Sequence, residues 1–423
     1  MSPASARLLF GLTGHHVVMD YPEGNEFCVR WWRLLCKPSF VAVPRSMRQQ
    51  NSLSARRLNR ATLDRQLLLR RKRLGVIEGV RRVVALQAQE AASPYIALWN
   101  RLSKFHPTDL DTAFAARDVV KAPLMRITLH AVQAQDYPDF HTAMLPTLRA
   151  ARLNDRRFTE TGLSTADADA LVPQLLQFAA QPRTAAECEK LLEKPRMWWA
   201  LRTFAPLQHV PTGGPWSFSR RPSFVAAPSQ PGAADADESA QYLVRRYLEG
   251  FGPASANDVA QFVLFPRSRA RTREVLQSMA GTLKQLKGPD GTELFDVPGV
   301  RLPAEDTPAP PRLMAMWDSV LLAYADRSRI IPPDYRQLVT RRNGDLLPTL
   351  LVDGYVAGVW RPVEGGIEAT AFHPLSEEAW DGLAGEARKL VAFLADREPQ
   401  VYRRYGHWWK TLPKTDMRVL PAK

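Results

Sequence analysis

Cysteine is scarce in this sequence, which contains only Cys28, Cys36 and Cys188 among 423 residues. These cysteines form no CxxC pair and no His/Cys spacing typical of zinc ligands, so we expect a reducing compartment and no structural metal. No apolar run approaches the roughly 20 residues that a membrane span requires. The first residues hold only a short apolar stretch, shorter than a secretory signal needs. We therefore expect a protein without metal, cofactor or membrane association.

Acidic residues are also few, with 43 Asp and Glu against 57 Lys and Arg and a formal net charge of +14. Residues 45–82 hold twelve of the basic residues and only two acids, Asp64 and Glu78. Further arginines recur within residues 149–157 and 267–273. Positive charge repeated over three segments favours a long polyanion such as DNA. Solvated helix faces are the alternative, and charge alone does not separate the two interpretations.

One pattern, short helices followed by a pair of strands, recurs three times along the chain. The three units span about residues 58–145, 163–228 and 237–299. Alternating apolar residues in PLMRITLHAV (123–132) predict a strand, and the turns at Gly213–Gly214 and at PDG (289–291) predict hairpins. Helices followed by a β-hairpin are typical of a winged helix, a variant of helix-turn-helix. Winged helices also serve as protein-interaction modules, so the pattern alone does not prove DNA binding.

The C-terminal segment is predicted to be rich in strands. LPTLLVDGYVAGVW (347–360) carries a hairpin signal at Asp353–Gly354, and GIEATAFHP (366–374) supplies another strand. A helix is expected at about 376–396, capped by Ser376. The predicted fold is therefore α+β, with three tandem winged-helix units followed by a C-terminal β-rich, barrel-like domain.

Composition also predicts where the domains divide. Residues 1–46 show no sustained period, so we expect an N-terminal extension that is disordered or a mis-assigned start. SQPGAADADE (229–238) and PAEDTPAPPR (303–312) have the composition of linkers. The predicted winged-helix units are 47–162, 163–236 and 237–302, and the C-terminal domain is 303–423.

Two glutamines, Gln87 and Gln89, stand one residue apart in LQAQEAASPYIALWNRL (86–102). On a regular helix such residues point about 200° apart and cannot share a target. Ser93–Pro94 has the pattern of an N-cap followed by proline at the first helical position. Residues 87–92 then connect two helices, where both side chains can be directed at one ligand.

Several motifs, taken together and in this order, resemble the winged-helix DNA-binding family that includes the AlkZ and YcaQ DNA glycosylases. They are LNRATLDRQLLL, LQAQEAASPYIALWNRL, RITLHAV, LQHVPTGGPW, FGPASANDVAQF, WDSVLLAYADRSRI and PTLLVDGYVAGVWRP. The resemblance covers roughly residues 55–400. It implies three winged helices and a β-rich domain around a basic DNA channel, and excision of alkylated or crosslinked purines.

The resemblance also implies roles for particular residues. In that family a Gln-x-Gln motif positions the attacking water, and Gln87 and Gln89 match it. Ile127 is a departure, because relatives usually carry glycine before the Thr-Leu-His triplet. A second QAQ at Gln133–Gln135 falls where the family has no functional glutamines, and we predict that it lies on the surface.

Amides suit this chemistry for a physical reason. A purine alkylated at N3 or N7 is positively charged and leaves readily, so the water that attacks the sugar needs placement and hydrogen bonding more than full deprotonation. Two carboxamides supply donors and acceptors in a fixed geometry. No lysine lies beside the motif, which predicts a monofunctional glycosylase. The alternative is that Gln87 and Gln89 only cap the preceding helix or face solvent.

DNA contacts are predicted for a further set of basic, aromatic and polar side chains. They are Arg56, Arg57, Arg60, Arg126, His130, Trp317, Asp318 and Arg327. Structural alternatives remain open for three of them: His130 as a satisfied group at a strand end, Asp318 bonded to a backbone turn, and Arg126 in solvent.

The predicted function is that of a monomeric, cytoplasmic, nucleoid-associated glycosylase acting on double-stranded DNA. Two alternatives remain open. One is a non-enzymatic winged-helix protein that binds DNA or regulates, and the other is a protein whose wings contact protein instead of DNA. Both the glycosylase and the non-enzymatic DNA-binding protein predict salt-sensitive DNA binding, so only release of a base separates them.

Overall fold

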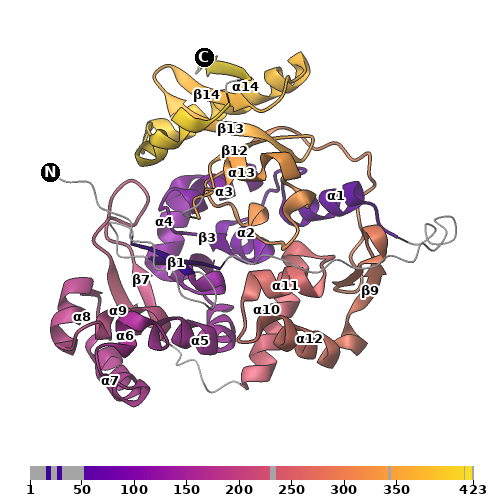
Figure 1. The fold of residues 1–423 in the computed structure, drawn as a ribbon. Coiled ribbons are helices and arrows are strands. Elements are labelled where there is room, and N and C mark those ends of the chain that lie inside the picture. The colour runs from indigo at the N-terminus through magenta and orange to yellow at the C-terminus, as the bar shows by residue number, and fades with distance from the viewer. Residues whose placement is uncertain are drawn as a thin grey trace.

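The computed structural model describes residues 16–20, 26–30, 52–228, 235–341, 344–413 and 415–421. The described chain contains both helices and strands, grouped as runs of helices followed by strands, which confirms the predicted α+β class (Figure 1). Within the predicted extension, residues 1–46, the strands β1 (His16–Asp20) and β2 (Glu26–Arg30) form an antiparallel hairpin. The remainder of that extension lies outside the described residues. No helix of the described part combines the length and apolar character needed to cross a membrane.

The first unit contains the two glutamines. Its elements are α1 (Ala55–Arg65), α2 (Val76–Val83), β3 (Leu86–Gln87), α3 (Ser93–Arg101), α4 (Pro107–Ala116), β4 (Val119–Pro123), β5 (Leu129–Gln133) and α5 (Tyr137–Leu153). The prediction of one strand over residues 123–132 was wrong: residues 124–128 form a turn between β4 and β5, because Arg126 and Ile127 adopt φ angles of 55° and 60°. The predicted cap was also misplaced, since Ser93 is already inside α3 and Ala92 takes the N-cap position.

The second and third units end in the predicted hairpins. The second consists of α6 (Arg156–Thr159), α7 (Thr165–Phe178), β6 (Arg183–Thr184), α8 (Ala185–Leu192), α9 (Met197–Phe204), β7 (Leu207–Val210) and β8 (Ser223–Ala226). The third consists of α10 (Ala236–Phe251), α11 (Ala256–Val263), α12 (Ser268–Ser278), β9 (Lys284–Lys287) and β10 (Glu293–Asp296). Figure 1 shows these two units at the lower left and lower right, below the centrally placed first unit.

The hairpins of the first two units are not separate. Their strands form one six-stranded sheet in the order β3-β5-β4-β7-β8-β6, joined where Lys121 of β4 pairs with His209 of β7. β9 and β10 form a sheet of their own. The continuous sheet brings the segment with the two glutamines next to residues of the second unit, which sequence order did not predict.

The C-terminal part is an antiparallel sheet covered by a helix. It contains β11 (Arg312–Leu313), β12 (Thr349–Val352), β13 (Tyr355–Val363), β14 (Gly366–Ala371), α14 (Glu377–Ala395) and β15 (Asp416–Pro421). The predicted Asp353–Gly354 hairpin joins β12 to β13, and Ser376 caps α14 by accepting a hydrogen bond from the Ala379 N–H at 3.2 Å. The strands pair in chain order, and β11 and β15 do not pair with each other among the described residues, so a closed barrel is not confirmed.

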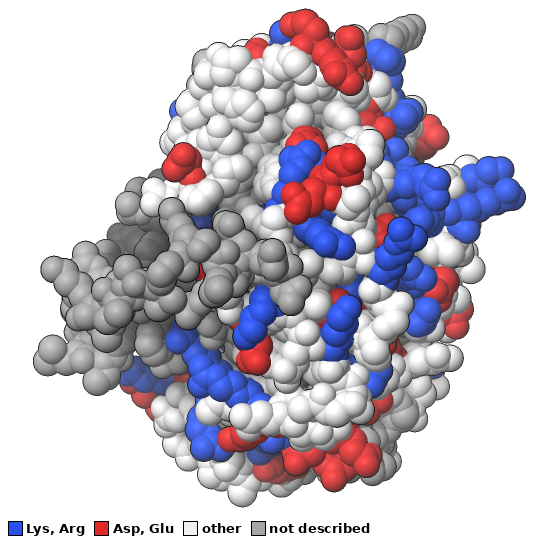
Figure 2. Space-filling model, turned by 90° about the vertical axis from the view of Figure 1, so that its right-hand side faces the viewer, with Lys and Arg blue, Asp and Glu red and all other residues white. Residues whose placement is uncertain are grey.

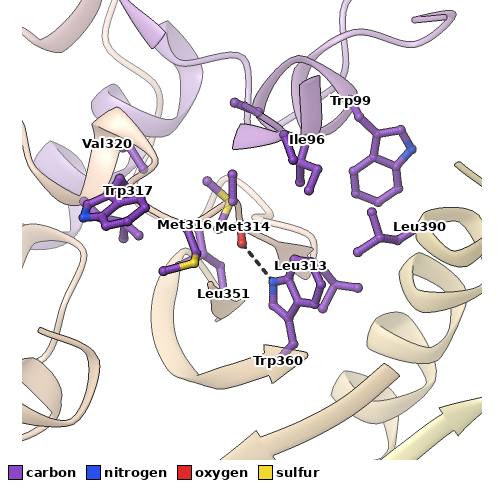
Figure 3. Close-up of a cluster of buried hydrophobic side chains, with 14 of the residues drawn as sticks. Ile96, Trp99, Leu313, Met314, Met316, Trp317, Val320, Leu351, Trp360 and Leu390 are labelled. Carbon is purple, nitrogen blue, oxygen red and sulfur yellow. Dashed lines mark hydrogen bonds between the residues drawn. The ribbon is translucent and has the colours of Figure 1, made fainter. Parts of the chain in front are cut away.

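A buried apolar cluster attaches α3 to the C-terminal sheet (Figure 3). Ile96 and Trp99 of α3 pack with Leu390 of α14 and with residues that precede and follow β12. The Trp360 indole N–H donates to the Met314 carbonyl at 2.8 Å, so the polar atom of this large ring is satisfied inside the core. The helix that follows the two glutamines is therefore held at its apolar face by the C-terminal part of the chain.

Candidate active site

The chain turns sharply just before the two glutamines. Val84 follows α2 with φ 73° and ψ −57°, and the Ala85 N–H donates to the Val83 carbonyl at 2.9 Å. This is a γ-turn of the rare, strained kind, and a β-branched residue makes it more costly. The Ser319 hydroxyl donates to the Ala85 carbonyl at 2.8 Å and accepts from the Gln87 N–H at 3.3 Å. A residue of the C-terminal part thus stabilises the turn that redirects the chain from α2 into β3.

Gln87 and Gln89 lie on non-helical backbone, which is the condition that convergence of their side chains requires. Gln87 Oε1 accepts a hydrogen bond from the Gln89 N–H at 3.1 Å, and Gln89 Oε1 accepts one from the Leu129 N–H at 2.7 Å. Each carboxamide is therefore oriented by a main-chain donor. Gln87 is only 3% exposed, and its Nε2 is buried without a hydrogen-bond partner. Neither glutamine is therefore a simple solvent-facing residue.

Gln89 lines a small pocket between the first and second units, with a cavity volume of about 30 Å³. The lining residues are Gln89, Pro123, Ile127, Leu129, Arg152, Arg202, Thr203, His209, Pro222 and Phe224. Two arginines and no carboxylate are among these residues, so the pocket favours an anionic ligand. Gln87 is not part of the lining. The structure brings one amide of the motif to the pocket and holds the other behind it.

His130 lies directly opposite Gln87 in the pairing of β3 with β5. Its Nδ1 lies 3.0 Å from the Thr128 carbonyl, and its Nε2 is buried without a partner. Burial and the nearby positive charge of Arg126 lower the pKa of His130 to about 3, against the weaker opposite effect of the Thr128 hydrogen bond. The imidazole is therefore neutral at physiological pH.

Arg126 and Arg327 form a second positively charged feature, in which Arg126 lies close to His130. Both terminal nitrogens of Arg126 are buried without a hydrogen-bond partner. Burial and the charge of Arg327 lower the pKa of Arg126 to about 9, and burial and Arg336 lower the pKa of Arg327 to about 10. The buried Arg126 guanidinium and the half-buried Arg327, which donates to Thr340 Oγ1 at 3.4 Å, have no carboxylate partner among the described residues, so an anion would stabilise them. The alternative of a solvated Arg126 is wrong.

The three predicted DNA contacts on α1 differ in how exposed they are and in what they bind. Arg56 donates to both carboxylate oxygens of Asp353, at 2.7 and 3.1 Å, on the surface. Arg60 is completely buried, and its guanidinium donates to the Thr307 carbonyl at 2.7 Å and to Asp353. Because its donors are used inside the protein, Arg60 joins α1 to the C-terminal part and does not reach the surface. Arg57 is exposed in an open groove that it lines with Lys284 and Arg301.

Trp317 and Asp318, also predicted to approach DNA, are interior residues. Trp317 is 2% exposed, lies in the apolar cluster of Figure 3, and donates from its indole nitrogen to the Gly344 carbonyl at 3.1 Å. Asp318 accepts two 2.7 Å hydrogen bonds from Arg101, and both side chains are fully buried. These contacts explain the two residues as parts of the folded core, so the predicted DNA contact is corrected.

Several residues of the site were missed by sequence reasoning. Arg152 belongs to a basic segment that was recognised, but its place in the pocket depends on the second unit, where it stacks 4.6 Å above Trp199 and donates to Thr203 at 2.9 Å. His209 reaches the pocket through the β4–β7 junction, and burial together with Lys121 and Arg202 holds its pKa well below the usual value. No group of three or more His, Cys, Asp or Glu suited to a metal occurs in the described ranges.

Basic side chains are spread over the surface. On the face shown in Figure 2, Lys and Arg gather across the middle, with an acidic group at the centre and further acidic groups toward the top and bottom. Ion pairs such as Arg56–Asp353 and Arg418–Glu377 neutralise part of the positive charge. Only part of the 57 Lys and Arg side chains is therefore available to a ligand, while the net charge of +14 is unchanged by such pairs.

Ile127 gives a testable consequence of the turn between β4 and β5. A β-branched residue at φ 60° is strained, whereas glycine adopts this conformation freely. We expect Ile127→Gly to be more stable than Ile127→Ala by about 1 kcal/mol, the reverse of the usual order of the two residues. The measurement is the denaturant midpoint of both variants.

Leu129→Gly and Leu129→Ala are the matched control for Ile127, because Leu129 is buried in β5 with ordinary strand geometry. At that position alanine should be the more stable of the two. An Ile127→Ala protein as stable as Ile127→Gly would contradict the strained turn.

Two buried neutral histidines predict a loss of stability in acid. Burial lowers the pKa of His130 to about 3 and that of His141 to about 4, from 6.5. Below about pH 6.5 the unfolded chain binds protons that the folded protein does not, so the free energy of unfolding should fall, by about 2 kcal/mol per histidine at pH 5. Denaturant midpoints at pH 5 and pH 7.5 test this. The His141→Phe variant should lose part of the pH dependence, because it removes one of the two groups.

The fold and the site together define a class of protein. The chain is α+β and is built from helix-and-hairpin units. It presents oriented amides beside arginines, its buried histidines are neutral, and none of the described residues that line the pocket is acidic. These features suit an enzyme that acts on a polyanion. A family model described as DNA glycosylase AlkZ-like matches residues 80–393. The chain belongs to this family, which confirms the resemblance seen in its motifs and the prediction of a DNA glycosylase.

Two relatives illustrate the similarity. The chain is 24% identical over 341 residues to an interstrand DNA cross-link repair glycosylase of Streptomyces sahachiroi, covering 73% of this chain and 88% of the relative. It also superimposes on the solved structure of the Streptomyces sahachiroi DNA glycosylase AlkZ with a TM-score of 0.69 and 20% identity, over 82% of this chain and 99% of that chain. The structural likeness shows a shared fold.

Proposed function

We propose that this protein hydrolyses the N-glycosidic bond of purines alkylated at N3 or N7, or crosslinked, in double-stranded DNA, with Gln87 and Gln89 as catalytic residues. The observation that carries the proposal is the pair of carboxamides fixed by main-chain N–H donors at 3.1 and 2.7 Å, beside a pocket lined by arginines. Their orientation is set before substrate arrives, which is what placement of a nucleophile requires.

Neutral amides suit a substrate that is already cationic. The alkylated base leaves with the electrons of its bond to the sugar, so a strong acid or base is not needed. The acid next in sequence to the motif, Glu90, accepts hydrogen bonds from Arg404 at 2.6 Å and Tyr405 at 3.1 Å, which supports an amide and not a carboxylate as the functional group. No lysine occurs among the described lining residues of the Gln89 pocket, which supports a monofunctional hydrolase without a Schiff base.

DNA recognition is proposed to use the helix-and-hairpin units as winged helices. The proposed divisions are 47–162, 163–236, 237–302 and 303–423, preceded by an extension over 1–46. Arg126 and Arg327, both without a carboxylate partner among the described residues, would each gain a phosphate partner. Arg57, with Lys284 and Arg301 along the same groove, would add exposed phosphate contacts.

The name of the Streptomyces sahachiroi relative refers to interstrand cross-link repair. This supports crosslinked DNA as a substrate to test beside singly alkylated DNA. We also propose that the protein acts as a monomer in the cytoplasm, associated with the nucleoid, since a net charge of +14 favours association with DNA.

The test is base release from defined duplexes. The full chain is incubated with duplexes that carry one N7-methylguanine, one N3-methyladenine or one crosslink, and abasic sites are detected by alkali cleavage. Product is expected only after alkali, because a monofunctional enzyme leaves the strand intact. Cleavage without alkali would show lyase chemistry. Salt-sensitive DNA binding without base release from any duplex would favour the non-enzymatic DNA-binding protein, and absence of any DNA affinity at low salt would favour a protein-binding role.

A further inference from the structure

Gln87 and His130 are paired residues on the neighbouring antiparallel strands β3 and β5. Residues directly opposite in an antiparallel pair place their side chains on the same face, with Cβ atoms about 4.5–5.5 Å apart. Both side chains are buried, at 3% and 0% exposure. The Gln-x-Gln motif contains Gln87 but not the histidine opposite it.

Each of these side chains presents one unused polar atom. Gln87 Oε1 is engaged by the Gln89 N–H, so the carboxamide is oriented and its Nε2 is the unused donor. His130 Nδ1 faces the Thr128 carbonyl, which can only accept, so Nδ1 carries the proton and Nε2 is the unused acceptor. A buried polar atom without a partner destabilises the folded protein, and such atoms call for a bridging group.

A water molecule between the two atoms satisfies both. Its oxygen accepts from Gln87 Nε2–H, and one of its O–H groups donates to His130 Nε2. We propose that Gln87 and His130 hold the nucleophilic water in this way and that His130 is a catalytic residue that accepts its proton. The inference rests on the proposed glycosylase function and adds a residue outside the Gln-x-Gln motif.

The step balances in atoms and charge. A lone pair of the water oxygen forms the bond to C1′ of the sugar, and the bond from C1′ to the purine nitrogen breaks. The electron pair of that bond returns to the purine ring and cancels the positive charge of the alkylated base. The proton on the new C1′ oxygen passes to His130 Nε2 and then to solvent. The products are a neutral base, an abasic sugar and one proton.

Arg126 supports this direction of proton flow. Its positive charge and burial lower the pKa of His130 to about 3, so the imidazole is unprotonated before the reaction and does not retain the proton after it. A protonated C1′ oxygen is a far stronger acid than an imidazolium, so a histidine of this kind can still accept its proton. The positive charge of Arg126 lies near that of Arg327, and the DNA phosphate proposed to bind there would offset both charges.

The experiment compares His130→Phe, which keeps a ring but has no acceptor, with His130→Gln, which keeps an acceptor. Single-turnover excision of N7-methylguanine should slow by about 100-fold or more in His130→Phe and by no more than about tenfold in His130→Gln. The DNA dissociation constant should change little in either variant. His141→Phe is the matched control, because His141 is also buried but bonds the Phe204 carbonyl in a different part of the fold. It should excise at the wild-type rate.

A folded His130→Phe protein that excises at the wild-type rate would overturn the role of His130 while leaving the glycosylase proposal intact. Equal slowing in the Phe and Gln variants, with weakened DNA binding, would also overturn it and assign His130 a structural role. If His130→Phe does not fold, the folded His130→Gln variant serves as the test. Retained excision by that variant supports the water site, whereas a loss of excision rate beyond 100-fold at wild-type DNA affinity overturns it. Absence of excision by the wild-type protein would instead refute the proposed function.

Discussion

Replacing both Gln87 and Gln89 by alanine is expected to slow single-turnover base excision by about 10³-fold while DNA binding changes little. Both carboxamides are oriented by backbone donors and neither makes an ion pair. The expected loss of rate therefore comes from poorer placement of the water and not from a lost charge. The measurement is the rate of abasic-site formation from N7-methylguanine DNA with enzyme in excess. Each single variant should lose most of this rate, because the effects of catalytic groups that act as a unit are not additive.

The second QAQ provides a control within the same chain. Gln133 ends β5 and Gln135 is exposed, and neither lines the pocket that contains Gln89. Replacing both by alanine should leave the excision rate within about twofold of the wild type, as surface substitutions away from a site usually do. Equal loss of activity in the two double variants would contradict the assignment of the first motif.

Asp318→Ala is expected to lower the free energy of unfolding by about 3–5 kcal/mol, because it leaves the Arg101 guanidinium buried without a counter-charge. The two side chains are fully buried and joined by two 2.7 Å hydrogen bonds. Asp318 also accepts from the Val320 N–H at 3.1 Å, which adds to the loss. The denaturant midpoint measures the effect. DNA affinity of the protein that remains folded should be unchanged, in contrast to a residue that contacts DNA.

Two further variants sharpen the Asp318 test. Glu78→Ala breaks an ion pair with Arg81 whose side chains are 39% and 43% exposed, and it should change stability by less than about 1 kcal/mol. Arg101→Met combined with Asp318→Leu removes both charges and should recover much of the lost stability. If Asp318→Ala weakens DNA binding at unchanged stability, the interior role described above is wrong.

Local signals in the chain predicted many elements correctly. The Ser376 cap, the Asp353–Gly354 hairpin and the hairpins of the second and third units depend on hydrogen bonds and backbone angles within a few residues. The same local signals placed the two glutamines outside a helix, because the pattern after them starts a new helix. It failed at residues 123–132, where alternating apolar residues concealed a turn that Ile127 enters at a positive φ angle.

Several of the predicted DNA contacts were wrong, because the position of such a side chain depends on partners that are distant in sequence. Arg60, Trp317 and Asp318 have the residue types that reach DNA, yet each finds its partners inside the protein. Arg101 and Asp318 are 217 positions apart, and nothing in either segment indicates the other. A polar side chain is interpreted as a surface contact until the group that satisfies it is known.

The amino-acid sequence by itself determined the alternation of helices and hairpins, the place of the paired glutamines beyond a helix end, and the family of the chain, because these depend on neighbours in sequence. Only the tertiary structure decided that Gln87 lies opposite His130, that Gln89 opens beside Arg152 and Arg202 of two different units, and that the terminal nitrogens of Arg126 are buried without a hydrogen-bond partner. The reason is physical: strand pairing and burial between distant segments set which polar atoms remain unused, and those atoms define where a substrate and a water can be held.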